Sequence, residues 1–129
     1  MGRGSLAVLA ALGVLLVPSS ASSAPGKLLD IGRDRGLPVA FAKGRTTDPG
    51  KLLVRVRAKP RQPVEVTWDT NCSRGGKARV RQGRYTIRGP KLRLIGKGFR
   101  RADDCLVNVL AAYEDAKQAG RLKVEIYSR

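Results

Sequence analysis

Short segments in which apolar and polar residues alternate with a period of two run through most of this chain. Side chains that alternate in this way point to opposite faces of a β-strand, so one face can be buried and the other exposed. The stretch VEVTWDTNC places Val64, Val66 and Trp68 on one face and three polar residues on the other. This pattern predicts a half-buried strand that reaches Cys72.

Four further segments show the same alternation: KLLVRVRAK, GRYTIR, PKLRLI and RLKVEIYS. We expect their inward faces to be formed by Leu52, Val54, Val56, Ala58, Tyr85, Ile87, Leu92, Leu94, Leu122, Val124 and Ile126. The turn-forming stretches TDPGK, SRGGK, RGPK and AGR separate them. LLDI and LPVAFA flank GRDRG and could form an N-terminal hairpin. Short strands at this spacing predict an all-β fold, a small antiparallel β-sandwich or a partly open barrel.

One segment, DDCLVNVLAAYEDAKQAG, fits two structures. Its acidic start, internal alanines and final glycine are helix signals, whereas Cys105, Val107, Val109, Ala111 and Tyr113 alternate as in a strand. We favour a strand from about Cys105 to Tyr113, followed by a loop or a short turn of helix near residues 114–119. The helical alternative stays open at this point.

The N-terminus has the three-part layout of a secretory signal peptide. Arg3 precedes an apolar run from Leu6 to Val17, and small residues follow up to Ala24. The run of twelve residues is shorter than the roughly 20 that a membrane-spanning helix needs. We therefore expect a cleaved signal peptide over residues 1–21, a short flexible N-terminus over 22–27 and one β-rich domain over 28–129. An uncleaved anchor is the alternative.

The two cysteines indicate a disulfide. Export leads to an oxidising compartment, where cysteines usually pair, and Cys72 and Cys105 would close a loop of 33 residues. The chain-entropy model assigns such a loop about 3.7 kcal/mol of stabilisation. A zinc site or a catalytic thiol would need partners that the chain lacks, since it contains no histidine.

Three stretches resemble a group of small exported domains from high-GC Gram-positive bacteria: VEVTWDTNCSRGG, CLVNVLAAY and GRLKVEIYS. Those domains pair a Trp-x-x-x-Cys strand with a later Cys-x-Val strand and finish on a Gly-Arg-Leu-x-Val strand. The similarity covers residues 64–127. It implies an exported β-rich domain with one disulfide, and it carries over no functional residue, because the group has no established activity.

Positive charge dominates the expected mature chain. Without residues 1–21 the chain has 25 basic and ten acidic residues, and eleven of the basic ones lie between the cysteines. Such a surface attracts polyanions, and salt weakens the attraction. The expected partners are teichoic acid, acidic polysaccharide, an anionic lipid surface or extracellular DNA. The residues expected to bind them are Lys77, Arg79, Arg81, Arg84, Arg88, Lys91 and Arg93. The alternative is a solvated face that only keeps the protein soluble.

Enzymatic function finds little support in the residues. The chain has no Ser-His pair, no phosphate-binding glycine loop and no metal-ligand cluster, so we expect no cofactor. A hydrolase built from distant carboxylates such as Asp69 and Glu125 is a minor alternative. No helix-turn-helix, zinc-finger or RNP pattern indicates sequence-specific nucleic-acid recognition. We predict a monomeric, secreted or envelope-associated, non-enzymatic domain, with a protein-binding module such as a protease inhibitor, or an inert envelope module, as alternatives.

Overall fold

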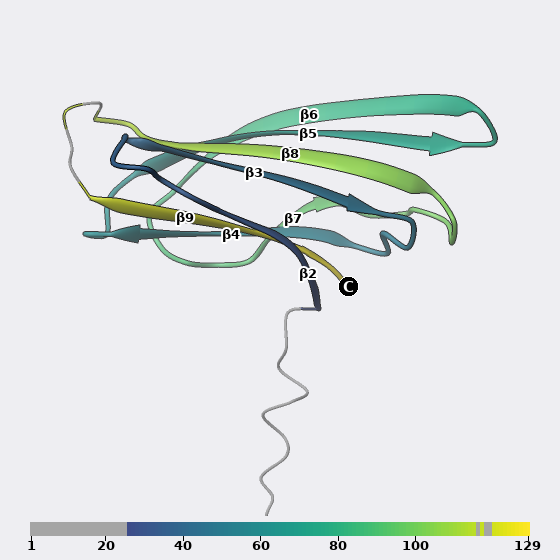
Figure 1. Ribbon diagram of the computed structural model, residues 1–129, viewed down its shortest axis with the longest axis horizontal. Helices are drawn as coiled ribbons and strands as arrows, with labels where there is room; N and C mark the ends of the chain where they lie inside the picture. The colour runs from purple at the N-terminus through teal and green to yellow at the C-terminus, as the bar shows by residue number, and fades with distance from the viewer. Residues whose placement is uncertain (1–25, 116, 118–119) are drawn as a thin grey trace, which may run out of the picture.

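Two four-stranded antiparallel sheets pack against each other in the computed structural model, which describes residues 26–115, 117 and 120–129 (Figure 1). The strand order is β2-β9-β4-β7 in one sheet and β3-β8-β5-β6 in the other. The strands are β2 (Lys27–Arg33), β3 (Val39–Thr46), β4 (Leu52–Lys59), β5 (Val64–Arg74), β6 (Lys77–Ile87), β7 (Arg93–Gly96), β8 (Asp104–Tyr113) and β9 (Arg121–Ser128). The prediction of an all-β antiparallel sandwich is confirmed.

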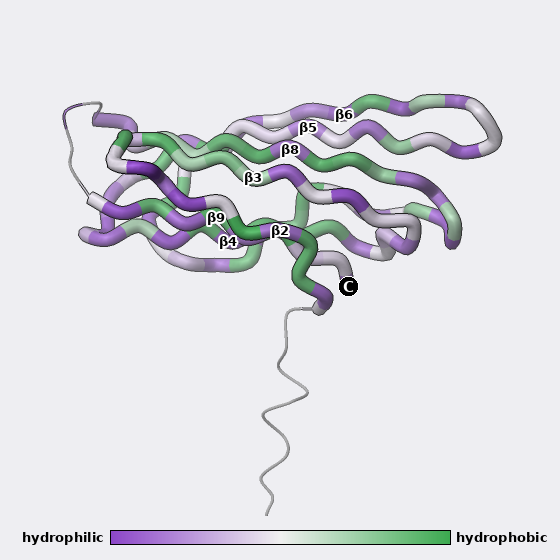
Figure 2. Tube along the Cα trace, in the orientation of Figure 1, coloured by the Kyte–Doolittle hydropathy of each residue, from purple (hydrophilic) through white to green (hydrophobic). Residues whose placement is uncertain are grey.

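The core lies between the two sheets and is built from the inward positions of the alternating segments. Figure 2 shows hydrophobic and hydrophilic residues following one another along the strands. The largest fully buried apolar side chains come from four strands: Leu52, Val54, Val64, Val66, Val107, Val109, Leu122, Val124 and Ile126. Because both sheets contribute one face, the remaining faces stay available to solvent.

The segment with two possible structures is a strand. β8 spans Asp104–Tyr113 and pairs with β5 on one side and β3 on the other. Cys72 of β5 lies directly opposite Cys105 of β8, and the two form the predicted disulfide inside the sandwich. No helix occurs among the residues that the structure describes, and residues 116, 118 and 119 of the expected short helix lie outside them.

The predicted N-terminal hairpin is wrong. β2 pairs with β9 and β3 pairs with β8, so the two strands belong to different sheets. Asp34 explains this, because its backbone amide donates to the carbonyl of Leu122 at 3.0 Å and its carboxylate accepts from the Leu122 amide at 2.6 Å. These bonds hold the end of β2 on β9. The chain then crosses to the other sheet.

The inward position predicted for Leu94 is also wrong. Leu94 is 43% exposed, whereas the next residue, Ile95, is 7% exposed and joins the core. The β4–β7 ladder shifts register between Leu52 and Leu53, and this bulge reverses the alternation of the short strand.

Glu125 and Tyr127 alternate with the inward residues and so lie on the outer face of β9, but they are only 6% exposed each. Arg55 Nε donates to Glu125 Oε1 at 2.9 Å, and Arg57 Nε donates to the same oxygen at 3.3 Å. The Tyr127 hydroxyl donates to Glu125 Oε2 at 2.9 Å. Burial alone would raise the pKa of Glu125, but these hydrogen bonds outweigh it and hold the pKa below its ordinary value.

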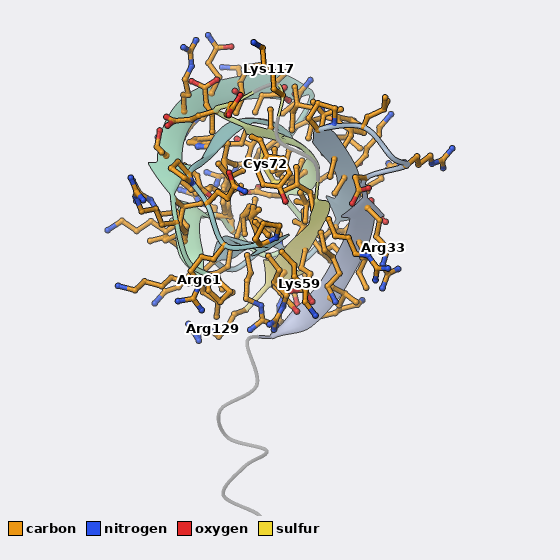
Figure 3. All side chains as sticks on the ribbon, turned by 90° about the vertical axis from the view of Figure 1, so that its left-hand side faces the viewer. Arg33, Lys59, Arg61, Cys72, Lys117 and Arg129 are labelled. Carbon is orange, nitrogen blue, oxygen red and sulfur yellow. A yellow bond between two sulfur atoms is a disulfide. The ribbon has the colours of Figure 1, made fainter. Side chains whose placement is uncertain are left out.

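The sandwich is closed on one side and open on the other. β2 and β3 meet on one side, where the Lys43 amide donates to Asp30 Oδ2 at 2.7 Å. On the opposite side the edge strands β6 and β7 share no backbone ladder within the described ranges, and we call this the open side (Figure 3). The β5–β6 hairpin, turned by Gly75 and Gly76 with positive φ angles, projects beyond the rest of the molecule (Figure 1).

The predicted signal peptide, residues 1–21, lies outside the described residues, as do positions 22–25 of the expected flexible N-terminus. Lys27, placed in that flexible segment, already belongs to β2. Within the described part of the chain, no helix has the length and apolar character needed to cross a membrane.

Candidate anion-binding surface

All ten aspartates and glutamates of the protein lie among the described residues, and several of them form ion pairs with arginines. Asp103 binds Arg74 through two hydrogen bonds of 2.8 and 2.7 Å and accepts a third from the Arg100 amide. Arg74 and the Arg100 amide lower the pKa of Asp103 to about 2. Asp104 pairs with Arg45 at 2.7 Å, and Glu125 binds Arg55 and Arg57. These three carboxylates are therefore already paired and do not neutralise the other cations.

One group of such cations lies where the β5–β6 hairpin projects. A pocket of about 330 Å³, here called the hairpin pocket, lies between the inner face of this hairpin and the segment after β7. Its lining contains Arg74, Lys77, Arg79, Arg81, Lys97 and Asp103. Asp103 is held by Arg74, so four cations of this pocket have no ion-pair partner among the described residues. In the ladder, Arg79 lies opposite Cys72 and Arg81 opposite Thr70, which places both arginines on the face that carries the disulfide.

Aromatic side chains occupy the middle of the open side. Trp68 pairs with Gly83 across the β5–β6 ladder, and its half-buried indole covers that glycine. Tyr85 follows on the same face of β6, and the Arg93 guanidinium lies 4.5 Å from the centre of its ring. Burial raises the pKa of Tyr85 to about 12, so the phenol is neutral at physiological pH. The open side thus combines cations with two aromatic rings.

A second and larger pocket, the end pocket, lies at the end of the sandwich that faces the viewer in Figure 3. It measures about 690 Å³ and opens between the last residues of β2, β4 and β6 and the first residues of β5 and β9. Its charged lining consists of Arg33, Asp34, Arg57, Lys59, Arg61, Arg88, Arg121 and Lys123. Seven of these eight residues are basic, but the ladders place Arg33, Arg57, Lys59, Arg121 and Lys123 on the outer face of their sheet, on the same side as Glu125.

The seven residues predicted to bind polyanions are all exposed, but they do not form one surface. Lys77, Arg79 and Arg81 line the hairpin pocket, and Arg88 lines the end pocket. Arg93 stacks on Tyr85 between the two pockets. Arg84 points to the outer face, where its guanidinium lies 3.8 Å from the Glu65 carboxylate, and Lys91 is exposed in the connection from β6 to β7.

Sequence reasoning missed most of the end pocket and Lys97 of the hairpin pocket. The end-pocket cations come from strand ends and loops that are distant in the chain. In the sequence, each of these residues is a single charged residue beside an alternating segment. The residues come close together because β9 pairs with both β2 and β4. Lys97 follows β7 directly. In the sequence, the high content of basic residues between the two cysteines was the only indication that Lys97 could belong to a basic surface.

The described residues offer neither a metal-ligand cluster nor a free thiol. They contain no group of three or more His, Cys, Asp or Glu side chains that could hold a metal ion, and both cysteines are in the disulfide. Asp69 and Glu125 lie on the outer faces of different sheets, so this carboxylate pair is not assembled. Asp69 instead accepts a hydrogen bond from Asn108 at 2.9 Å.

In comparisons with known proteins, no family model matches this chain and no curated protein matches its sequence. The resemblance to exported single-disulfide domains stays a prediction.

Proposed function

We propose that this protein is an exported, non-enzymatic module that binds anionic polymers of the cell envelope or its surroundings. The row of cations on the open side carries the proposal. Lys77, Arg79 and Arg81 follow one another at every second position of β6, about 7 Å apart, and Lys97 faces them across the hairpin pocket. Charges repeated along a strand fit a polymer with repeated anionic groups better than a single small anion.

The length of β6 favours an extended ligand. Its 11 residues span roughly 35 Å, and Trp68, Tyr85 and Arg93 continue the surface past the hairpin pocket. Teichoic acids, acidic polysaccharides, anionic lipid surfaces and extracellular DNA all present such charge. The Cys72–Cys105 disulfide supports export, because disulfides persist in oxidising compartments.

A protein-binding module is the second candidate. The projecting β5–β6 hairpin is the observation that favours it, since the disulfide anchors the base of an exposed loop that ends in Arg74 and Lys77. Such a module, for example a protease inhibitor, would rely on apolar and backbone contacts. Its binding would survive molar salt, whereas polyanion binding would not.

The test compares two variants of equal charge. The open-side variant replaces Lys77, Arg79, Arg81 and Lys97 by glutamine. The control variant replaces four other exposed cations by glutamine, namely Lys27, Lys43, Lys51 and Lys117. Binding to isolated envelope material, acidic polysaccharide and DNA is measured at low and molar salt. We expect binding to be lost at molar salt, and at low salt in the open-side variant only. Equal losses of binding in both variants would show that binding depends only on the net charge of the protein, and would contradict a localised binding surface.

A further inference from the structure

The outer edge of β6 is a long strand edge that no other strand covers in the described part of the chain. β6 is the outermost strand of its sheet and pairs with β5 alone (Figure 1). Among the described residues, its 11 residues form no backbone–backbone hydrogen bond outside that ladder. Such an edge presents a row of unpaired N–H and C=O groups on which a further strand can form.

The turn of the hairpin shows which residues of β6 present these groups. A two-residue glycine turn joins β5 to β6, so Arg74 and Lys77 close the hairpin and exchange both backbone hydrogen bonds. Hydrogen-bonded pairs recur at every second position, which makes Cys72 and Arg79 such a pair as well. The residues that alternate with them direct both backbone groups away from β5: Ala78, Val80, Gln82, Arg84 and Thr86.

The disulfide leads independently to the same assignment. The Cα atoms of Cys72 and Cys105 are 4.0 Å apart. This distance fits a cross-strand pair without backbone hydrogen bonds, at about 4.5 Å, better than a hydrogen-bonded pair, at about 5.5 Å. Cys72 therefore turns its N–H and C=O away from β8 and towards Arg79 of β6.

The β6 edge lacks two of the features that block further pairing. The ladder with β5 runs without a register shift along its whole length, and β6 contains no proline. What protects the edge is positive charge, supplied by Lys77, Arg79, Arg81 and Arg84. A second copy of β6 would place these cations beside one another, so charge opposes self-pairing. A negatively charged strand meets no such opposition.

We propose that the β6 edge binds an extended acidic peptide segment of another protein, which adds a fifth strand to this four-stranded sheet. Side chains of the added strand alternate between the two faces. On the inner face they lie beside Lys77, Arg79 and Arg81, which have no ion-pair partner among the described residues. On the outer face they lie beside Val80, which is 62% exposed. The segment that fits therefore alternates acidic residues with apolar or β-branched ones.

This partner differs from the polymer proposed for the open side, because it requires the backbone of β6. A polyanion needs only the cations, whereas an added strand also needs the outward N–H and C=O groups of alternate residues. The two proposals can therefore fail separately.

Hydrogen exchange of the backbone amides tests the inference on the unaltered chain. The probe is the capped peptide Thr-Glu-Val-Glu-Thr-Glu-Thr, and its control is Glu-Glu-Glu-Thr-Val-Thr-Thr, which has the same charge without the alternation. We expect the probe to slow the exchange of the Val80, Gln82 and Arg84 amides, whereas those of Arg79 and Arg81 are already protected by the ladder with β5. The control peptide should bind about tenfold more weakly and protect none of the three.

A proline at position 80 separates backbone pairing from charge. Val80→Pro removes one outward N–H but no hydrogen bond to β5, and Val80→Thr is the matched control that keeps the N–H. We expect Val80→Pro to bind the probe about tenfold or more weakly than Val80→Thr, while both bind acidic polysaccharide and DNA like the parent protein. Should Val80→Pro fail to fold, N-methylation of the probe replaces it: methyl groups on the amides that face β6 should abolish binding, and those on the alternate amides should not. Binding of the probe without new amide protection would overturn the proposal, and so would equal binding by the two variants, whatever the result with the polymers.

Discussion

Trp68 lies directly across the β5–β6 ladder from Gly83, and its indole ring fills the space that a side chain at position 83 would occupy. A Cβ atom built on Gly83 would lie 2.6 Å from Cζ2 and 2.8 Å from Nε1 of the indole. The glycine therefore lets the ring lie flat against β6. This places a large aromatic surface in the middle of the open side, between the arginines of the hairpin pocket and Tyr85.

Replacing Gly83 by alanine should displace this ring. Overpacking at such a contact costs about 1–3 kcal/mol. We expect the free energy of unfolding, measured by urea denaturation, to fall by that amount, together with a shift in tryptophan fluorescence. Gly89→Ala is the matched control, because a Cβ there meets no atom within 4 Å. If the fluorescence of the Gly83→Ala variant were unchanged, the indole would not lie where the structure places it.

The disulfide should contribute much of the stability. Cys72 and Cys105 are both buried, and their bond closes a 33-residue loop that contains β6 and β7. Replacing both cysteines by alanine should lower the free energy of unfolding by about 3.7 kcal/mol in the chain-entropy model. Alkylation of the native protein without reductant should label neither cysteine. Stoichiometric labelling would refute the pairing.

Acid should weaken the fold through Asp103. Its pKa is lowered from 3.8 to about 2 in the folded protein, so its ion pair with Arg74 stabilises the fold fully above the unfolded value and is lost as the pH falls towards about 2. Asp103→Asn should unfold at a lower temperature at neutral pH. Between about pH 4 and pH 2 its melting temperature should fall less steeply than that of the parent. Parallel melting curves over this range would exclude the proposed role.

The sequence predicts the parts of this fold that depend on neighbouring residues. Alternation with a period of two locates β4, β5 and β9, since the side chains of a strand must take opposite faces whatever the strand pairs with. The disulfide follows from two cysteines in an exported chain without histidine. In the ambiguous segment, alternation from Cys105 to Tyr113 was a better guide than the helix signals, because β8 is a central strand whose inward side chains pack in the core against the other sheet.

Features that depend on distant pairing could not be read from the sequence. The contact of Asp34 with Leu122 spans 88 positions and places β2 on β9 rather than on β3. The bulge that exposes Leu94 arises from the ladder between β4 and β7. The end pocket has the same origin, because its cations adjoin only after the strands are ordered. The sequence shows that many basic residues lie between the two cysteines. It does not show that those on β6 are divided between the two faces of the strand.

The salt dependence of DNA binding tests the central claim, that cations on the open side bind a polyanion directly. For single-stranded DNA, the logarithm of the association constant should fall against the logarithm of salt concentration with a slope of about −0.7 per phosphate contacted, so four to six contacts give roughly −3 to −4. Removing the four charges of the open-side variant should make this slope shallower by about 2 to 3, whereas the control variant should change it by less than about 0.5. Equal changes in both variants, or a slope near zero in the parent protein, would contradict the account.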